Sequence, residues 1–223
     1  MIDSSEMIPI GISISKKLDG SILKRNDIQF LVQDAKQQLL RNYFDYNIIH
    51  IIIKNYKIDK SNYTFLPNDM TCNLISLDIL FICFPKKNIE YFKNKFFKLN
   101  ISVNQIFSSS YARSINYKKN FPSIANIAFI DIGFNKTSIT CFEFNEITFF
   151  DTIPVGGNHI SKDISKILKI SLSEAENLKL NFDKDEKLLK EKEISLDLIQ
   201  QIIFARIEEI LELSSKSIEL NLL

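Results

Sequence analysis

The sequence is poor in the residues that interrupt or cross-link a chain. It holds no tryptophan, five glycines, five prolines and three cysteines in 223 residues. Cys72, Cys83 and Cys141 share no close spacing and are odd in number, so the sequence predicts neither a disulfide framework nor a zinc site. Such cysteine usage indicates a reducing cytoplasm.

Net charge and long apolar runs are also missing. The 28 basic and 27 acidic residues leave a net charge of +1, which gives no electrostatic attraction to phosphate backbones, so no nucleic-acid partner is expected. No window approaches the about 18 uncharged apolar residues of a membrane span, and the first residues lack the pattern of a secretory signal. The sequence predicts neither secretion nor a span.

The first half of the chain has the pattern of an α+β unit. Isoleucines at every second position over 8–14 predict a half-buried strand. A turn at Asp19-Gly20 is expected next, followed by a helix capped by Asn26 or Asp27. Helical spacing defines the expected apolar face of this helix: Ile28, Leu31, Val32, Ala35, Leu39 and Leu40.

Two apolar runs follow. Residues 48–53 predict a strand, in which His50 is expected to be a packed residue rather than a base. Residues 73–84 predict a central strand stopped by Pro85, with 66–69 as a loop before it. The remaining elements of this half are a helix over 89–97, a strand over 101–106 and a helix over 110–117.

Aromatic residues and lysines are interspersed within the first of these helices. Tyr91, Phe92, Phe96 and Phe97 accompany three lysines over 93–98, a mixture that is also found on nucleic-acid platforms. Because the spacing is helical and the chain is neutral, we expect the aromatic rings to pack in the core and the lysines to face solvent.

The second half predicts a meander of short strands and then helices. Strands are expected over 124–130, 137–144 and 146–152. The first of them is expected to be buried and to end in Asp131-Ile132-Gly133. Ile160, Ile164 and Leu168 define a helix face, and Ser171 with Glu174 predicts a capping box for the next helix. Residues 181–193 are expected to form an exposed loop. The stretch 194–223 predicts one long helix with these residues inward: Leu196, Ile199, Ile203, Ile207, Ile210 and Leu211.

Three short motifs could carry chemistry, each with a structural alternative. Asp131-Ile132-Gly133 followed by Thr137 could hold Mg²⁺ and polyphosphate, or merely close a hairpin. Gly156-Gly157 before a helix could bring backbone N–H groups to an anion, or allow an unusual helix entry. Glu176 and Lys179 could project together into a site, or form a solvated ion pair.

In this order and spacing, the motifs resemble a known family. The segments are Ile130-Asp131-Ile132-Gly133, then Thr137, Ile153-Pro154-Val155-Gly156-Gly157-Asn158-His159-Ile160-Ser161-Lys162-Asp163-Ile164, Ala175-Glu176-Asn177-Leu178-Lys179 and Ala205-Arg206-Ile207-Glu208-Glu209-Ile210-Leu211-Glu212-Leu213. Together they resemble FtsA, the bacterial actin-like cell-division family. Upstream, Pro67-Asn68-Asp69-Met70 and Ser108-Ser109-Ser110-Tyr111-Ala112 are similar to that family's inserted subdomain and its exit.

The resemblance implies an α/β (α+β) chain with a partial actin-like ATPase fold, related to ribonuclease H, and an SHS2-type (1C) interaction subdomain. It places that subdomain and its exit at 1–106 and a partial second domain, of 2A/2B type, at 107–223. It implies ATP with Mg²⁺ as cofactor, with Asp131 contacting the metal indirectly. The implied cofactor-binding residues are Asp131, Gly133, Thr137, Gly156, Gly157, Glu176 and Lys179.

The sequence departs from the family pattern at the second phosphate turn. Two glycines and a threonine usually follow the Asp-x-Gly, and Phe134, Asn135 and Lys136 stand there instead. The first phosphate loop, the adenosine turn and the amphipathic tail of the family are also not found, which predicts a fragment, a split gene product or a degenerate paralogue. Weak nucleotide binding and no catalytic residue are therefore expected.

The resemblance implies a scaffold that links the FtsZ ring to the inner membrane and recruits later division proteins, at the cytoplasmic face of the division site. Alternatives are a PilM-like pilus-assembly or chaperone-like ATPase relative, or a vestigial SHS2 binding module. Self-association is expected through the strand 8–14 and the helix that carries Ile164 and Leu168. No direct membrane insertion is expected, because the last helix carries glutamates rather than a basic face.

Overall fold

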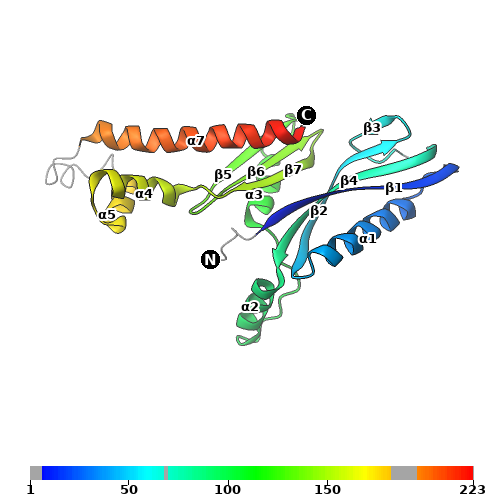
Figure 1. Cartoon of the computed structure of the whole chain (residues 1–223), viewed down its shortest axis with the longest axis horizontal. Helices are drawn as coiled ribbons and strands as arrows, with labels where there is room; N and C mark the ends of the chain where they lie inside the picture. The colour runs from blue at the N-terminus through cyan, green and yellow to red at the C-terminus, as the bar shows by residue number, and fades with distance from the viewer. Residues whose placement is uncertain (1–6, 68–69, 182–194, 223) are drawn as a thin grey trace. The chain divides into compact units, whose positions relative to one another are not determined.

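A computed structural model describes residues 7–67, 70–181 and 195–222 of the chain (Figure 1). Its strands are β1 (Ile8–Ile22), β2 (Tyr46–Ile58), β3 (Ser61–Tyr63), β4 (Thr71–Pro85), β5 (Ile127–Ile132), β6 (Thr137–Glu143) and β7 (Glu146–Ile153). Its helices are α1 (Arg25–Asn42), α2 (Lys86–Phe97), α3 (Ser109–Lys118), α4 (Gly157–Leu168), α5 (Leu172–Asn181) and α7 (Leu196–Leu222). The loop predicted at 181–193 lies outside the described residues, except for Asn181 at the end of α5.

The chain divides into two compact units. Unit 1 comprises Met1–Phe129 and Thr140–Asp151, and unit 2 comprises Ile130–Ile139 and Thr152–Leu223. Contacts therefore group α3 with the first unit, although it lies beyond residue 106. The assignment of 1–106 and 107–223 to separate functional domains stays a prediction.

Unit 1 is built on an antiparallel sheet in the order β1-β4-β2-β3. β4 lies between β1 and β2 and pairs with both, as its largely apolar sequence predicted, and Pro85 ends it. Among the described strands, β1 pairs with β4 alone and forms an edge of the sheet, and it contains the strand predicted over 8–14.

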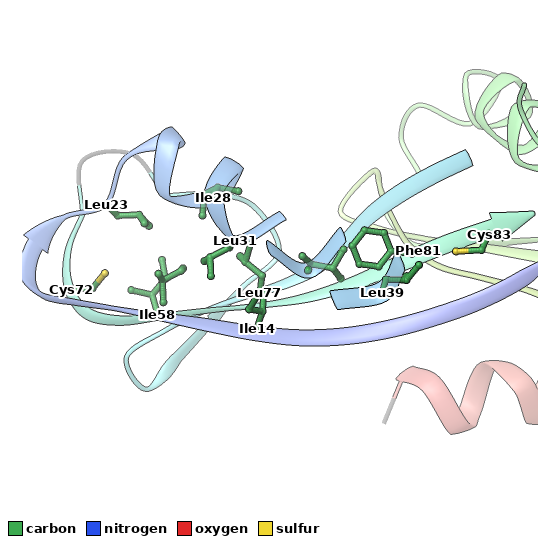
Figure 2. Packing of buried hydrophobic residues seen from close by; sticks show 13 residues of the cluster. Ile14, Leu23, Ile28, Leu31, Leu39, Ile58, Cys72, Leu77, Phe81 and Cys83 are labelled. Carbon is green, nitrogen blue, oxygen red and sulfur yellow. The ribbon is translucent and has the colours of Figure 1, made fainter. Parts of the chain in front are cut away.

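Helix α1 covers one face of this sheet. Leu31, Ala35 and Leu39 lie on its buried side and pack against alternate residues of β4, among them Leu77 and Phe81 (Figure 2). The predicted cap at Asn26 or Asp27 is wrong: Lys24 is the N-cap, and Asp27 lies in the first turn, where its carboxylate accepts the Lys24 backbone N–H at 2.9 Å. Apolar spacing therefore predicted this helix correctly, except that Leu40 is exposed.

A second cluster occupies the other face of β4. Leu80, Ile82 and Phe84 belong to this cluster, together with Ile89 of α2 and Phe150 of β7. From Ile79 to Phe84, odd-numbered β4 residues belong to the cluster with α1 and even-numbered ones to this second cluster, so this half of β4 is buried on both faces. This is the physical reason for the continuous apolar run in its sequence.

Three further predictions in unit 1 are wrong. Asp19 and Gly20 do not end the first strand; both have positive φ inside β1, where the register with β4 shifts. Residues 101–106 form no strand, because no described strand pairs with them. Tyr91, Phe96 and Phe97 of α2 are exposed rather than part of the core.

Strands β5, β6 and β7 form a sheet in that order, which confirms the predicted meander. The strand expected over 124–130 begins at Ile127 and was wrongly expected to be buried, because its side chains alternate between half-buried and exposed. β6 is the buried member, from Thr137 to Phe142, since it has a neighbour on each side.

The helices of unit 2 enclose a small core of their own. Ile160 and Ile164 of α4, Ala175 and Leu178 of α5, and Ile199 and Ile202 of α7 are its buried members. The α4 face that was expected to support self-association is therefore covered, and that prediction is wrong for Ile164. Leu196 and Leu211 were expected to point inward, but both are exposed. In the described part of the chain, no helix combines the length and apolar character that crossing a bilayer requires.

Candidate functional site

The site that the motifs predicted lies entirely within unit 2, where the β5–β6 turn meets the start of α4. The Gly133 N–H donates to the Lys136 carbonyl at 2.8 Å and closes the turn. None of residues 134–136 is among the described residues with positive φ. Phe134, Asn135 and Lys136 therefore form the turn without the backbone conformation that favours glycine.

Gly156 touches this turn so closely that no side chain fits. A Cβ on Gly156 would lie 2.5 Å from the Gly133 carbonyl oxygen, 2.7 Å from the Lys136 nitrogen and 2.8 Å from the Phe134 carbonyl oxygen. Its backbone is extended, with φ −161°, so any residue could adopt its conformation. Close approach explains this glycine, rather than an unusual helix entry.

The first N–H groups of α4 donate to the turn. The Gly157 N–H lies 2.9 Å from the Gly133 carbonyl oxygen, and the Asn158 N–H lies 2.7 Å from that of Phe134. The Gly156 N–H donates to Nδ1 of His159 at 3.1 Å. Backbone donors at a helix N-terminus are ordinarily left over for a cap or an anion, and here the protein itself supplies the acceptors.

Thr137 strengthens the same junction. Its hydroxyl is fully buried and donates to the Val155 carbonyl at 2.8 Å. That bond ties the start of β6 to the segment that leads into α4. Asp131, at the end of β5, is half-buried and also interacts with another group of the protein.

Glu176 and Lys179 of α5 form a cluster with Ser161 of α4. The Lys179 ammonium donates to Glu176 at 2.7 Å, to the Ser161 hydroxyl at 2.9 Å and to the Gly157 carbonyl at 3.0 Å. The Ser161 hydroxyl, which is fully buried, also donates to Glu176. The Lys179 side chain is only 14% exposed, so this is a packed cluster and not the solvated pair of the alternative interpretation.

The environment of Glu176 favours its ionised form. Burial alone would raise the pKa of this carboxyl, but the hydrogen bonds from Lys179 and Ser161 and the charge of Lys179 outweigh burial and lower the pKa. The lysine thus stays paired with a carboxylate at neutral pH. With the carbonyl of Gly157 as its third acceptor, Lys179 joins α5 to the beginning of α4.

Five of the seven predicted cofactor-binding residues are joined by direct contacts, Gly133, Gly156, Gly157, Glu176 and Lys179, and Thr137 bonds Val155, the residue before Gly156. These contacts do not fit a bound triphosphate, because the hydroxyl, the ammonium and the helix N–H groups already have protein acceptors. Among the described residues, no three His, Cys, Asp or Glu side chains gather as a metal site. The geometry supports an internal junction between the β5–β6 turn, α4 and α5.

Sequence reasoning missed two members of this junction. Ser161 connects Lys179 with Glu176, and its only signal in the sequence is its place four residues after Gly157 on the buried side of α4. His159 was part of one motif but had no binding role assigned to it, and the structure shows its Nδ1 accepting the Gly156 N–H. His159 lies three positions after Gly156, which is the spacing at which a side chain caps a helix N-terminus.

The architecture defines the class of protein, a partial actin-like ATPase fold. A chain of the PilM–PilN type IV pilus biogenesis complex matches it with a TM-score of 0.59, covering 92% of this chain and 57% of that chain. The two sequences are only 10% identical, so this likeness concerns the fold alone.

Within this class, the sequence matches one family. The model of "Cell division protein FtsA" matches residues 128–213. FtsA of Agrobacterium fabrum is 25% identical over 217 residues, covering 88% of this chain and 48% of the relative. FtsA of Helicobacter pylori is 25% identical over 138 residues, covering 62% and 28%. The resemblance to the FtsA family is confirmed, and the chain spans about half the length of the first of these relatives.

Proposed function

We propose that the chain is a cell-division scaffold of the FtsA type that works through protein contacts and binds nucleotide weakly. The observation that carries this proposal is the junction of unit 2. Its Thr137 hydroxyl, Lys179 ammonium and α4 N–H groups donate to the protein itself. A unit whose predicted cofactor-binding residues are already hydrogen-bonded within the protein does not need a nucleotide to become ordered.

The family match supports the choice of partners. FtsA relatives are cell-division proteins by name. By this proposal, the chain works at the cytoplasmic face of the division site. There it would bind FtsZ and later division proteins, and contribute to the link between the FtsZ ring and the inner membrane. The SHS2-type role of unit 1 is part of the same proposal, supported by an element order in which a strand (β1) and a helix (α1) precede the strands β2, β3 and β4.

The likeness in fold to a chain of the PilM–PilN complex favours one alternative, a role in pilus assembly. That complex covers more of this chain than the FtsA model does, but at far lower identity than the FtsA relatives. The two functions predict different partners, so a binding experiment can separate them.

The test is capture of purified FtsZ by the immobilised chain, with and without Mg·ATP. We expect specific binding that nucleotide leaves unchanged, because the junction is complete without it. Bovine serum albumin serves as the negative control, and a PilN-type cytoplasmic peptide tests the alternative. No capture of FtsZ, or capture of the PilN-type peptide only, would overturn the division role.

A further inference from the structure

The end of helix α2 carries an exposed apolar group in unit 1. Ile89 and Phe92 belong to the cluster under β4, but the following turn leaves that core. Phe97 is 77% exposed and Leu99 is 68% exposed, and Phe96 and Ile101 beside them are also exposed. Figure 1 shows α2 continuing beyond the end of β4. The interpretation of these rings as core residues is therefore wrong.

A defined turn presents these side chains. The Ile101 N–H donates to the Phe96 carbonyl at 3.0 Å, the Asn100 N–H donates to the Phe97 carbonyl at 2.9 Å, and Asn100 has φ +59°. This is the hydrogen-bond pattern of a Schellman motif, with Asn100 as its left-handed residue. Four exposed apolar residues thus project from a hydrogen-bonded helix end rather than from a loose loop.

Positive charge surrounds this apolar group. Residues 86–101 contain five lysines and one glutamate, a net charge of +4 in a chain whose total is +1. Lys93, Lys95 and Lys98 are exposed, and Lys95 lies 5.2 Å from the ring of Tyr91. The chain as a whole is nearly neutral, but positive charge is thus concentrated at the end of α2.

We propose that this α2 tip, formed by Phe96, Phe97, Leu99 and Ile101 with Lys93, Lys95 and Lys98, adsorbs to anionic membrane surfaces. Apolar side chains can enter the boundary between headgroups and acyl chains, while lysine side chains extend to lipid phosphates. An acidic leaflet supplies both environments at once. The proposal concerns surface adsorption, so it requires no membrane-spanning segment.

Two observations favour lipid over nucleic acid. Leu99 and Ile101 have no π-face on which a base could stack, yet they make up half of the apolar group. The exposed lysines are few and the rest of the chain carries net negative charge, which disfavours a long phosphate backbone. A lipid surface needs only local charge, because its headgroups are short and mobile.

The expectation of no direct membrane insertion rested on the net charge of +1 and on the closing helix, which carries Glu208, Glu209 and Glu212. Neither observation concerns the local charge and exposure of α2. The adsorption of the α2 tip goes beyond the proposed function and does not rest on it. A chain that fails to bind FtsZ could still adsorb, and the reverse also holds.

The test is flotation of the full chain with vesicles of phosphatidylcholine, with and without phosphatidylglycerol. We expect flotation only with phosphatidylglycerol, and its loss at high salt. Replacing Lys93, Lys95 and Lys98 with glutamine should weaken partitioning by roughly 100-fold, at about fivefold for each lysine. The double variant Phe97→Ser and Leu99→Ser should weaken it by about tenfold or more.

Phe44→Ser is the matched control, because Phe44 is 66% exposed in the same unit but lies next to Asp45 rather than among lysines. It should float like the unaltered chain. Circular dichroism should show the same helix content in all variants, since the replaced side chains are exposed.

The absence of tryptophan permits a second readout. With Phe97→Trp as the sole tryptophan, anionic vesicles should shift its emission to shorter wavelength, whereas Phe44→Trp should not respond. No flotation with phosphatidylglycerol, equal flotation of the lysine and control variants, or a response to single-stranded DNA but not to vesicles would each overturn the proposal.

Discussion

His50 shows how a single polar residue can be held without charge inside unit 1. It is 6% exposed, stacks on Tyr111 with ring centroids 3.8 Å apart, and its Nε2 accepts the Ser108 backbone N–H at 3.0 Å. Burial lowers the pKa of His50 from its ordinary value of 6.5 to about 4. The neutral ring thereby fastens the start of α3 to strand β2.

Stability should therefore fall in mild acid. Because the folded pKa lies below the unfolded pKa, the unfolded chain takes up a proton more readily, and the stabilising effect is lost as pH falls from about 6.5 toward 4. Between pH 7 and 5 we expect unit 1 to lose about 2 kcal/mol of unfolding free energy. Urea unfolding followed by circular dichroism measures this.

The variant His50→Phe supplies the comparison, since it keeps a ring at this position but cannot titrate. Its stability should vary much less between pH 7 and 5, although it is lower at pH 7 because the Ser108 N–H loses its acceptor. If the unfolding free energy of His50→Phe changed with pH as much as that of the unaltered chain, another group would be titrating in this range.

Lys179 is the second residue whose removal should be measurable. Lys179→Met removes the ammonium that donates to the Gly157 carbonyl and to Glu176, leaves the Glu176 carboxylate with the Ser161 hydroxyl as a donor, and should lower the unfolding free energy by about 1–3 kcal/mol. The exposed Lys162 of α4 is a matched control, and Lys162→Met should change stability by less than about 0.5 kcal/mol. Equal urea midpoints for the two variants would contradict the packed cluster.

At the scale of elements, the meeting of the β5–β6 turn with α4 depends on Gly156. Gly156→Ala should destabilise unit 2 by about 1–3 kcal/mol, because the new methyl group would overlap three backbone atoms that cannot move separately. Gly11 of β1 is the matched control, since a Cβ there meets nothing within 4 Å. Thermal unfolding of the two variants measures the difference, and a Gly156→Ala variant as stable as Gly11→Ala would refute the tight junction.

Elements with a complete local pattern could be predicted from the sequence. The run of β4 and the spacing of α1 record burial directly, and the Ser171–Glu174 capping box appears as expected, with the Glu174 carboxylate 2.9 Å from the Ser171 N–H. The segment 101–106 has apolar residues too, but a strand also needs a partner backbone, which local sequence does not encode. Phe96 and Phe97 fail for a related reason, because helical spacing shows which residues share a face and not whether that face is covered.

Motif order grouped the candidate residues but did not reveal their hydrogen bonds, and their binding of a cofactor stays a prediction. It brought together the β5–β6 turn, which carries Gly133 and Thr137, and the entry to α4 at Gly156, and the structure places these two segments in contact. Which partner each donor takes depends on distances below 3 Å between segments far apart in sequence. The engagement of the Thr137 hydroxyl by Val155 could therefore not be read from residue types alone.

At the scale of the whole molecule, self-association remains a prediction that now rests on fewer surfaces. β1 is an edge strand, but Pro9, the exposed Lys17 and the shift in register after Lys17 are features that discourage pairing with another strand. The α4 face is covered within unit 2. Sedimentation velocity should show weak, concentration-dependent association at most, and a tight dimer would require an interface that these observations do not identify.

In the proposed function, hydrogen bonds within the unit 2 junction take the place of contacts to a nucleotide. Calorimetric titration of the purified chain with Mg·ATP tests this most directly. A site that lacks several hydrogen bonds to phosphate should lose several kcal/mol of binding free energy. Each loss of about 1.4 kcal/mol weakens the affinity tenfold. We expect no saturable heat of binding at micromolar Mg·ATP, and the same capture of FtsZ with and without Mg·ATP in that buffer. A sub-micromolar dissociation constant for Mg·ATP would contradict it.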